Sequence, residues 1–166
     1  MLIVAAIIQQ GEQLLLVRQQ GQEDPVATWA IPGGKVEAGE LPTEALAREV
    51  HEETGLVVVD PGRLAYVVHG LQAHTGARLT AFVFDVSNWA GQLEPADPDE
   101  VILDVRFLPL QDALAVIEDL PWPVMREPLL AYLRHQSIAG SFWLYREDPD
   151  GRLGHISQVP TPSNGF

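Results

Sequence analysis

The chain has 166 residues, of which 46% are hydrophobic and 20% charged, and this composition predicts a single globular domain over residues 1–166 rather than a disordered chain. Its 10 Lys and Arg residues against 23 Asp and Glu residues give a net charge of −13, which argues against a protein that coats duplex nucleic acid, because such proteins neutralise phosphates. The sequence has no cysteine, so disulfides, thiol nucleophiles and cysteine zinc sites are excluded.

The first eight residues are apolar, but they lack the basic leader and the cleavage site of a signal sequence. We interpret them as the start of a first strand. No stretch has the roughly 18 to 20 continuous apolar residues that a membrane-spanning helix needs. We therefore expect a cytoplasmic protein that does not interact with membranes.

Two apolar runs open the chain, at residues 2–9 and 13–19, and Gly11 lies between them. This pattern is typical of two strands joined by a tight turn, so a hairpin is predicted. Residues 21–28 are predicted to be a polar loop. Residues 29–34 read as a short strand broken by one proline and two glycines, where the backbone must turn sharply.

Residues 42–54 change to helical periodicity. Pro42 suits a first helical turn, Thr43 is a candidate cap, and Gly55 is a stop signal. Four residues share an arc of about 100° that would face a sheet: Leu46, Ala47, Val50 and Thr54.

Further strand patterns follow, and together they predict a sizeable mixed sheet. Helices are expected over residues 110–120 and 124–136, and Pro128 limits where the second of them can begin. Residues 140–159 are expected to form an extra hairpin, and residues 160–166 to be flexible. The predicted strands are 56–59, 63–69, 77–86, 101–108, 141–146 and 152–159.

Glu49, Glu52 and Glu53 have the spacing i, i+3, i+4, which places their side chains on one strip of the predicted helix. Carboxylates this close repel one another unless a cation compensates, and Mg²⁺ prefers such oxygen ligands. The alternative is a solvated acidic face with an ion pair between Arg48 and Glu52. The glycine pair just before this helix favours a metal site, because glycine lets the backbone aim a carbonyl at the metal.

The segment from Gly34 to Leu56 resembles the Nudix box at every specified position. The pattern is Gly-x5-Glu-x7-Arg-Glu-U-x-Glu-Glu-x-Gly-U, in which U is aliphatic. The resemblance implies an α/β/α sandwich around a mixed sheet. It also implies an enzyme that hydrolyses a nucleoside diphosphate linked to another group and uses Mg²⁺ or Mn²⁺. The matching residues are Gly34, Glu40, Arg48, Glu49, Val50, Glu52, Glu53, Gly55 and Leu56.

Carried over to this sequence, the resemblance makes Glu49, Glu52 and Glu53 metal ligands, with the Gly33 carbonyl as a further ligand. Arg48 would orient a carboxylate. Family members often use one more acidic residue from a later loop as ligand or base. Glu100 is the first candidate, and its rivals are Asp97, Asp99 and Glu94. The base is left open among Glu52, Glu53 and Glu100.

The candidate substrate-binding residues are Arg18, Trp29, Gly34 and Glu40. Glu40 would also hold the loop to the helix. Arg18 has an alternative interpretation as a surface charge. Trp29 suits stacking on a base but equally suits core packing.

Three histidines and the apolar tail are further candidates for a functional role. His69 and His74 flank a loop that could border the cleft, but a pair of this kind usually faces solvent, and His51 should be exposed. The apolar run at residues 142–145 would cover the sheet edge or supply a homodimer contact.

Within the family, a nucleoside triphosphate pyrophosphohydrolase is preferred, because the chain is short. Hydrolysis of a sugar nucleotide or a dinucleoside polyphosphate is an alternative. A nucleotide-sensing domain without turnover is a second class, but the intact set of carboxylates argues against it. Isomerase chemistry on an isoprenyl diphosphate would need a cysteine, and the chain has none.

Overall fold

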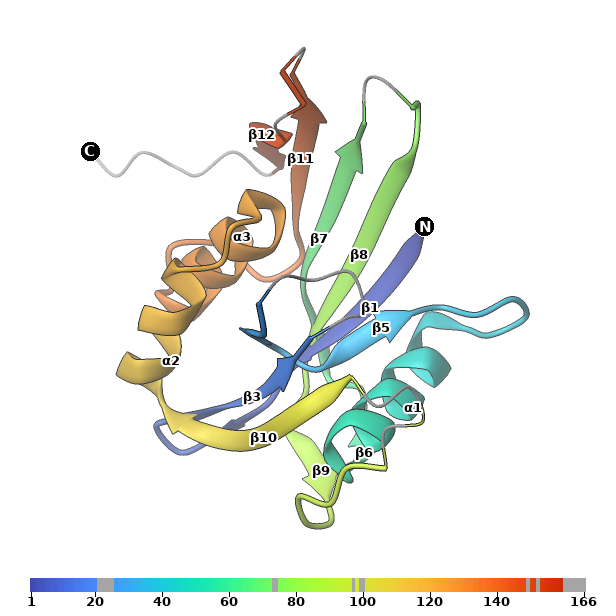
Figure 1. Cartoon of the computed structure of the whole chain (residues 1–166), viewed down its shortest axis with the longest axis vertical. Helices are drawn as coiled ribbons and strands as arrows, with labels where there is room; N and C mark the ends of the chain where they lie inside the picture. Colours follow the sequence, from blue (N-terminus) through green and yellow to red (C-terminus); the bar gives the residue numbers. More distant parts are fainter. Residues whose placement is uncertain are drawn as a thin grey trace.

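The computed structural model describes residues 1–20, 26–72, 75–96, 98, 101–148, 150–151 and 153–159. The chain folds into a mixed α/β structure (Figure 1). Its elements in chain order are β1 (Leu2–Ile7), β2 (Gln9–Gln10), β3 (Gln13–Gln19), β4 (Thr28–Ala30), β5 (Gly33–Lys35), α1 (Pro42–Thr54), β6 (Val57–Asp60), β7 (Arg63–Leu71), β8 (Arg78–Asp85), β9 (Asn88–Ala90), β10 (Ile102–Pro109), α2 (Leu110–Glu118), α3 (Pro123–Leu133), β11 (Ser141–Glu147) and β12 (Leu153–Val159).

The larger sheet has six strands in the order β12-β11-β7-β8-β1-β5. β1 runs parallel to β8 and β11 runs parallel to β7, while the other neighbours are antiparallel. This confirms the predicted mixed sheet. The tail hairpin is also confirmed, because β11 and β12 pair with each other and extend this sheet beyond β7.

A second sheet contains β10, β3 and β2 in that order, and β4 pairs with β3 at Val17, Arg18 and Gln19. The hairpin predicted at the start of the chain is therefore wrong in part: only β2 folds back on β3, while β1 joins the larger sheet. The residues of β1 explain this. Val4 and Ala6 are buried on one side and Ile7 on the other, and a strand covered on both faces belongs in the interior of a sheet.

Two hydrophobic cores lie on opposite sides of the strands. One core includes Leu15 of β3 together with Leu46 and Val50 of α1. The other includes Leu16 of β3 together with Ile117 of α2 and residues of α3. Figure 1 accordingly shows α1 on one side of the strands and α2 with α3 on the other, which is the expected α/β/α arrangement.

The ends of α1 differ in how well they were predicted. The backbone N–H of Leu41 donates to the Glu44 carboxylate at 2.8 Å, so the helix is capped at Leu41, and Thr43 lies inside it. The stop at Gly55 is confirmed: its φ is 81° and its N–H donates to the His51 carbonyl at 2.8 Å. That left-handed conformation favours glycine.

Compared with the prediction, the buried side of α1 lies closer to the glutamates of the helix. Leu46, Val50 and Thr54 are buried as predicted, but Ala47 is only partly buried and Ala45 is buried instead. Residue 45 lies eight positions before residue 53, on the same side of the helix. The helix therefore presents its acidic strip beside the sheet.

The predicted positions of α2 and α3 hold, with α2 ending at Glu118. Pro128 does not mark the start of α3, because it lies inside that helix.

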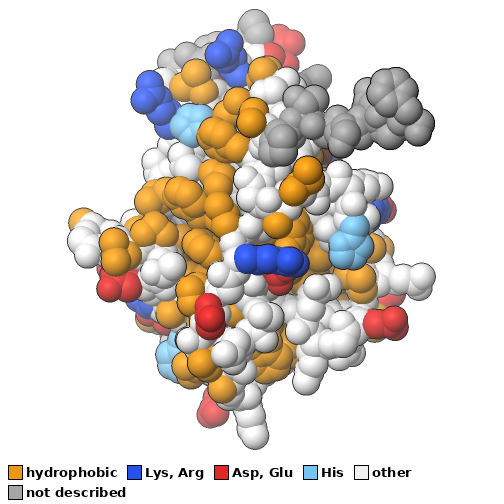
Figure 2. All heavy atoms as spheres, turned by 180° about the vertical axis from the view of Figure 1, so that it is seen from behind, with side chains coloured by type: hydrophobic (Ala, Val, Ile, Leu, Met, Phe, Trp, Pro, Cys, Tyr) orange, Lys and Arg blue, Asp and Glu red, His pale blue; other side chains and the backbone are white. Residues whose placement is uncertain are grey.

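Figure 2 shows an irregular band of hydrophobic side chains on the face turned away from the viewer of Figure 1. Among the described residues, no helix is both long enough and apolar enough to span a bilayer.

Candidate active site

Arg48 connects the acidic side chains at the start of the site. Its Nε and Nη2 atoms donate to the two carboxylate oxygens of Glu40 at 2.9 and 3.1 Å, and Nη2 also donates to the Lys35 carbonyl at 3.0 Å. Its Nη1 atom donates to Glu49 at 2.9 Å and to Glu52 at 3.1 Å. One guanidinium thus links three carboxylates and a backbone carbonyl, a geometry that its fixed fork of donors allows.

Glu40 ties the preceding loop to α1. Besides the two bonds from Arg48, its carboxylate accepts the backbone N–H of Glu37 at 3.0 Å. The hydrogen bond from Arg48, followed by that from Glu37, lowers the pKa of Glu40, and the same contact with Glu40 raises the pKa of Arg48. Both groups are thereby held in their charged forms.

The three carboxylates of the helical strip differ in exposure. Glu53 is 7% exposed, and the side chains of Glu49 and Glu52 are 15% and 32% exposed. Burial raises the pKa of Glu49, and the hydrogen bond from Arg48 opposes that change. The carboxylates therefore lie at the edge of the core rather than on a fully solvated face.

Gly33 and Gly34 fit closely against these groups. The N–H of Gly33 donates to the Glu53 carboxylate at 2.8 Å. A Cβ on Gly34 would lie 2.4 Å from the Glu49 carboxylate, and a Cβ on Gly33 would lie 2.2 Å from the Val4 carbonyl oxygen. Both positions exclude a side chain because the neighbouring atoms approach so closely. The glycine pair and the acidic strip form one contiguous site.

The fit of a metal ion can be judged from the chemistry of these donors. In the described ranges, no group of three or more acidic or histidine side chains is arranged to hold a metal ion. Glu49 and Glu52 face Arg48, and Glu53 faces the N–H of Gly33. The donor set nevertheless suits a hard divalent cation, because Glu40, Glu49 and Glu52 adjoin one guanidinium, Glu53 lies on the same helical strip as Glu49 and Glu52, and all four supply carboxylate oxygens.

Most candidates for the additional acidic residue, namely Glu100, Asp97 and Asp99, lie outside the described residues. Glu94 is exposed, and its backbone N–H donates to the Thr54 carbonyl at 3.0 Å. The N–H of Ala96 donates to the Glu52 carbonyl at 2.9 Å. These two bonds hold residues 94–96 against the C-terminal end of α1.

Arg18 and Trp29 lie opposite each other on neighbouring strands. Arg18 of β3 pairs with Trp29 of β4 on one side and with Asp104 of β10 on the other. Arg18 is exposed, whereas Trp29 is partly buried and packs against the core that contains α2. The guanidinium of Arg106 lies over the Trp29 ring, 5.4 Å from its centroid.

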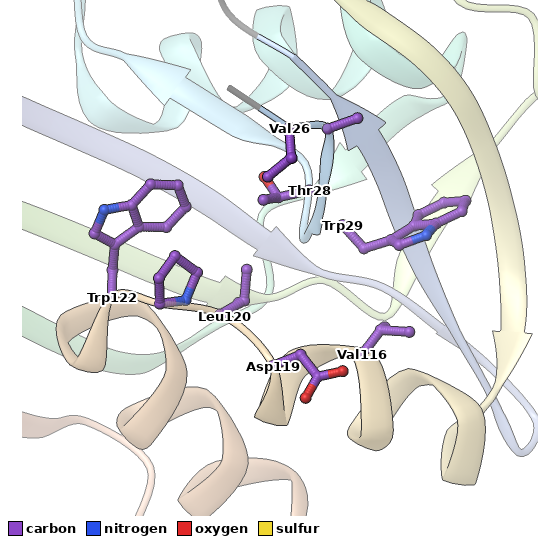
Figure 3. Close-up of a pocket in the computed structure, with 9 residues that line it drawn as sticks. Val26, Thr28, Trp29, Val116, Asp119, Leu120 and Trp122 are labelled. Carbon is purple, nitrogen blue, oxygen red and sulfur yellow. The ribbon is translucent and has the colours of Figure 1, made fainter. Parts of the chain in front are cut away.

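A cavity of about 470 Å³ lies beside Trp29 (Figure 3). Trp122 and Trp29 stand at its two sides in this view, and Asp119 lies on the α2 side. Trp122 is 41% exposed. The lining residues are Val26, Ala27, Thr28, Trp29, Val116, Asp119, Leu120, Pro121 and Trp122.

Sequence reasoning did not assign Arg106, Asp119 or Trp122 to a site. Aromatic and acidic residues beside two prolines were the available signal for Trp122 and Asp119, but only the packing of α2 against β4 brings them to Trp29.

The structure places His69 in a strand and His51 on the exposed side of α1. His69 lies within β7, partly buried, and its Nδ1 is 2.9 Å from the Thr80 hydroxyl oxygen. Its expected place at the border of a loop is wrong, because β7 continues to Leu71. His51 is exposed as predicted, and His74 lies outside the described residues.

Comparisons with known proteins extend this description. A family model described as NUDIX domain matches residues 1–131. Over 54 residues the chain is 43% identical to a CTP pyrophosphohydrolase of Escherichia coli (strain K12), a match that covers 32% of this chain and 40% of that protein. Over 93 residues it is 36% identical to an 8-oxo-dGTP diphosphatase of Haemophilus influenzae, which covers 54% of this chain and 65% of that protein.

Both relatives are therefore matched over less than two thirds of their length. A crystal structure described as a MutT protein from Bacillus halodurans aligns with 97% of this chain and 99% of its own chain, with a TM-score of 0.70. The two sequences are 22% identical. This likeness shows a shared fold.

Proposed function

The chain belongs to the Nudix family, and from this premise we propose that it is an enzyme that hydrolyses a pyrophosphate bond of a nucleoside triphosphate with Mg²⁺ or Mn²⁺. The observation that carries the proposal is the contact of Glu49 and Glu53 with the glycine pair, next to the network of Arg48. This arrangement supplies oxygen ligands beside a backbone bend. The two relatives described above, named for CTP and 8-oxo-dGTP, support a nucleotide substrate.

We assign the metal ligands to Glu49, Glu52, Glu53 and the Gly33 carbonyl. When bound there, a divalent ion would polarise phosphoryl oxygens and make a water molecule more acidic. Arg48 holds Glu49 and Glu52 in place through Nη1, and Glu40 fixes the rest of its guanidinium. A carboxylate then takes the proton from the attacking water, with Glu52, Glu53 and Glu100 as candidates.

The 470 Å³ cavity is the proposed site for the nucleobase. Trp29 at its wall is four residues before Gly33, so at most about 14 Å of chain separates the cavity from the acidic site. We propose that a single nucleotide spans this separation and contacts both. The exposed Trp122 offers a ring for stacking on a base, and the Asp119 carboxylate can accept hydrogen bonds from its N–H groups.

Arg18 is proposed to contact the substrate at the rim of the cavity. It is exposed and lies on the strand next to Trp29. A guanidinium there suits the phosphates of an anionic substrate. The alternative substrate classes, a sugar nucleotide and a dinucleoside polyphosphate, would place a second large group where the triphosphate ends.

The experiment that tests the proposal is a substrate panel with Mg²⁺ and with Mn²⁺. It includes nucleoside triphosphates, 8-oxo-dGTP, a UDP-sugar and a dinucleoside polyphosphate, and it measures release of phosphate and of pyrophosphate. We expect pyrophosphate from a triphosphate, and we expect Glu53→Gln to lower turnover by a factor of about 10² while the circular dichroism spectrum is unchanged.

Three results would contradict the proposal. Equal turnover by Glu53→Gln and the parent protein would remove Glu53 from the reaction. Tight binding of one nucleotide without turnover of any member of the panel would instead favour the sensing domain. Turnover of only the sugar nucleotide or only the dinucleoside polyphosphate would move the enzyme to another substrate class.

A further inference from the structure

Arg106 of β10 lies on the same side of its sheet as the cavity. It pairs in register with Leu16 of β3, which is buried in the core beside α2. Side chains directly opposite each other on paired strands share a face, and so do alternate residues along a strand. Arg106, Asp104, Arg18 and Trp29 therefore all project from the face of this sheet that α2 covers.

Arg106 contacts two of these neighbours. Its guanidinium carbon is 5.4 Å from the centroid of the Trp29 ring, within the range of a cation–π contact. Its Nη2 atom forms an ion pair with the Asp104 carboxylate. The carboxylate fixes the guanidinium from one side, and the guanidinium in turn rests over the indole.

The indole is also held by the core. Trp29 packs against the hydrophobic cluster that includes Ile117 of α2, and together with Val116 it lines the 470 Å³ cavity. Arg106 is not part of the cavity lining. The ring is thus restrained by the core and by a guanidinium that does not itself face the cavity.

We propose that Arg106 is a positioning residue that fixes the indole of Trp29 as a wall of the cavity and thereby sets the affinity for the base of the nucleotide. This inference rests on the proposed function in treating the cavity as the base site. Arg106 acts through Trp29 rather than by touching the substrate. A planar guanidinium is needed, because the compact ammonium of lysine stacks less well on an aromatic ring.

The first test follows the indole in the free protein and needs no turnover. The Trp29 Nε1–H resonance is assigned in a ¹H–¹⁵N spectrum by its disappearance in Trp29→Leu. Arg106→Met should shift or broaden this resonance, because the ring loses its cationic neighbour. Arg63→Met is the matched control: it removes an arginine from the ion pair with Asp85, at 2.7 Å, and should leave the resonance unchanged. An unchanged resonance in Arg106→Met would overturn the proposal.

The second test is a double-mutant cycle on the substrate that the panel identifies. Arg106→Met should raise KM about three- to tenfold and leave kcat within about twofold, and Arg106→Lys should resemble it. In the Trp29→Leu background, Arg106→Met should add nothing further. Independent effects of the two substitutions, or full activity of Arg106→Lys, would show that Arg106 acts on the substrate by its charge and would refute the positioning role.

A protein without turnover would refute the proposed function but would leave the first test decisive. In that case dGMP and CMP are titrated and the Trp29 resonance is followed. The inference would be supported if Arg106→Met bound either nucleotide more weakly than the parent protein while Arg63→Met bound it as tightly as the parent. Equal binding by the parent and Arg106→Met would refute it.

Discussion

Gly34 leaves no room for a side chain next to Glu49. A Cβ at this position would lie 2.4 Å from the carboxylate carbon and oxygens. We therefore expect Gly34→Ala to push the Glu49 carboxylate away from its present position and to lower turnover at least about tenfold, since small displacements of catalytic groups are costly. Steady-state kinetics on the identified substrate would measure this loss.

Gly154 provides the matched control for Gly34. It lies in a strand, its φ is not in the left-handed region, and a Cβ there would meet no atom within 4 Å. Gly154→Ala should keep the activity of the parent protein. If the two alanine variants had the same activity, the close approach of Gly34 to Glu49 would be irrelevant to the reaction.

Arg48 is the second residue whose geometry makes a definite prediction. Its three nitrogen atoms donate to Glu40, Glu49, Glu52 and the Lys35 carbonyl, and a lysine could not reach all of these partners at once. Arg48→Lys keeps the charge but should lower turnover about 10- to 100-fold. Turnover within twofold of the parent would mean that only the positive charge matters.

At the scale of elements, the end of α1 depends on Gly55. Its φ of 81° suits glycine, and a Cβ would lie 2.5 Å from the backbone of Glu94 in the segment docked on the helix. Gly140 has a similar φ of 78°, but a Cβ there would meet nothing within 4 Å. The two glycines thus share backbone strain and differ in steric contact.

We expect Gly140→Ala to destabilise the fold by about 1 kcal/mol, the typical cost of a left-handed conformation for a residue with a side chain. Gly55→Ala should cost clearly more, because the Glu94 segment must also move away from the helix. Urea unfolding of both variants measures the difference in the free energy of unfolding. Equal losses would show that the segment moves aside freely.

How much could be predicted also depends on the element. The acidic strip of α1 and its stop at Gly55 follow from spacing within one short segment, so local periodicity was enough. The cavity was not predictable, because Trp29 and Trp122 are far apart in the sequence and come to line the same cavity only through the packing of α2 against β4. The opening hairpin was predicted wrongly in part, because an apolar run alone does not identify the strand with which it pairs.

The whole molecule extends beyond the part that the family model matches. That match ends at residue 131, yet β11 lies beyond it and pairs with β7 in the larger sheet. Trp143 and Tyr145 of β11 are 7% and 3% exposed and belong to the core that α3 covers. The hairpin is therefore a structural part of the fold, and the expected homodimer contact on its exposed side chains stays a prediction.

Trp143 and Tyr145 allow the contribution of this hairpin to be measured. Trp143→Ala removes a buried ring from the core and should lower the free energy of unfolding by about 3–5 kcal/mol. Tyr145→Phe keeps the ring and removes only the hydrogen bond to the Glu127 carboxylate, at 2.9 Å, so its loss should be about 1 kcal/mol. Chemical denaturation of both variants tests this order. A loss below 1 kcal/mol for Trp143→Ala would mean that β11 only lies against a core that is already complete without it.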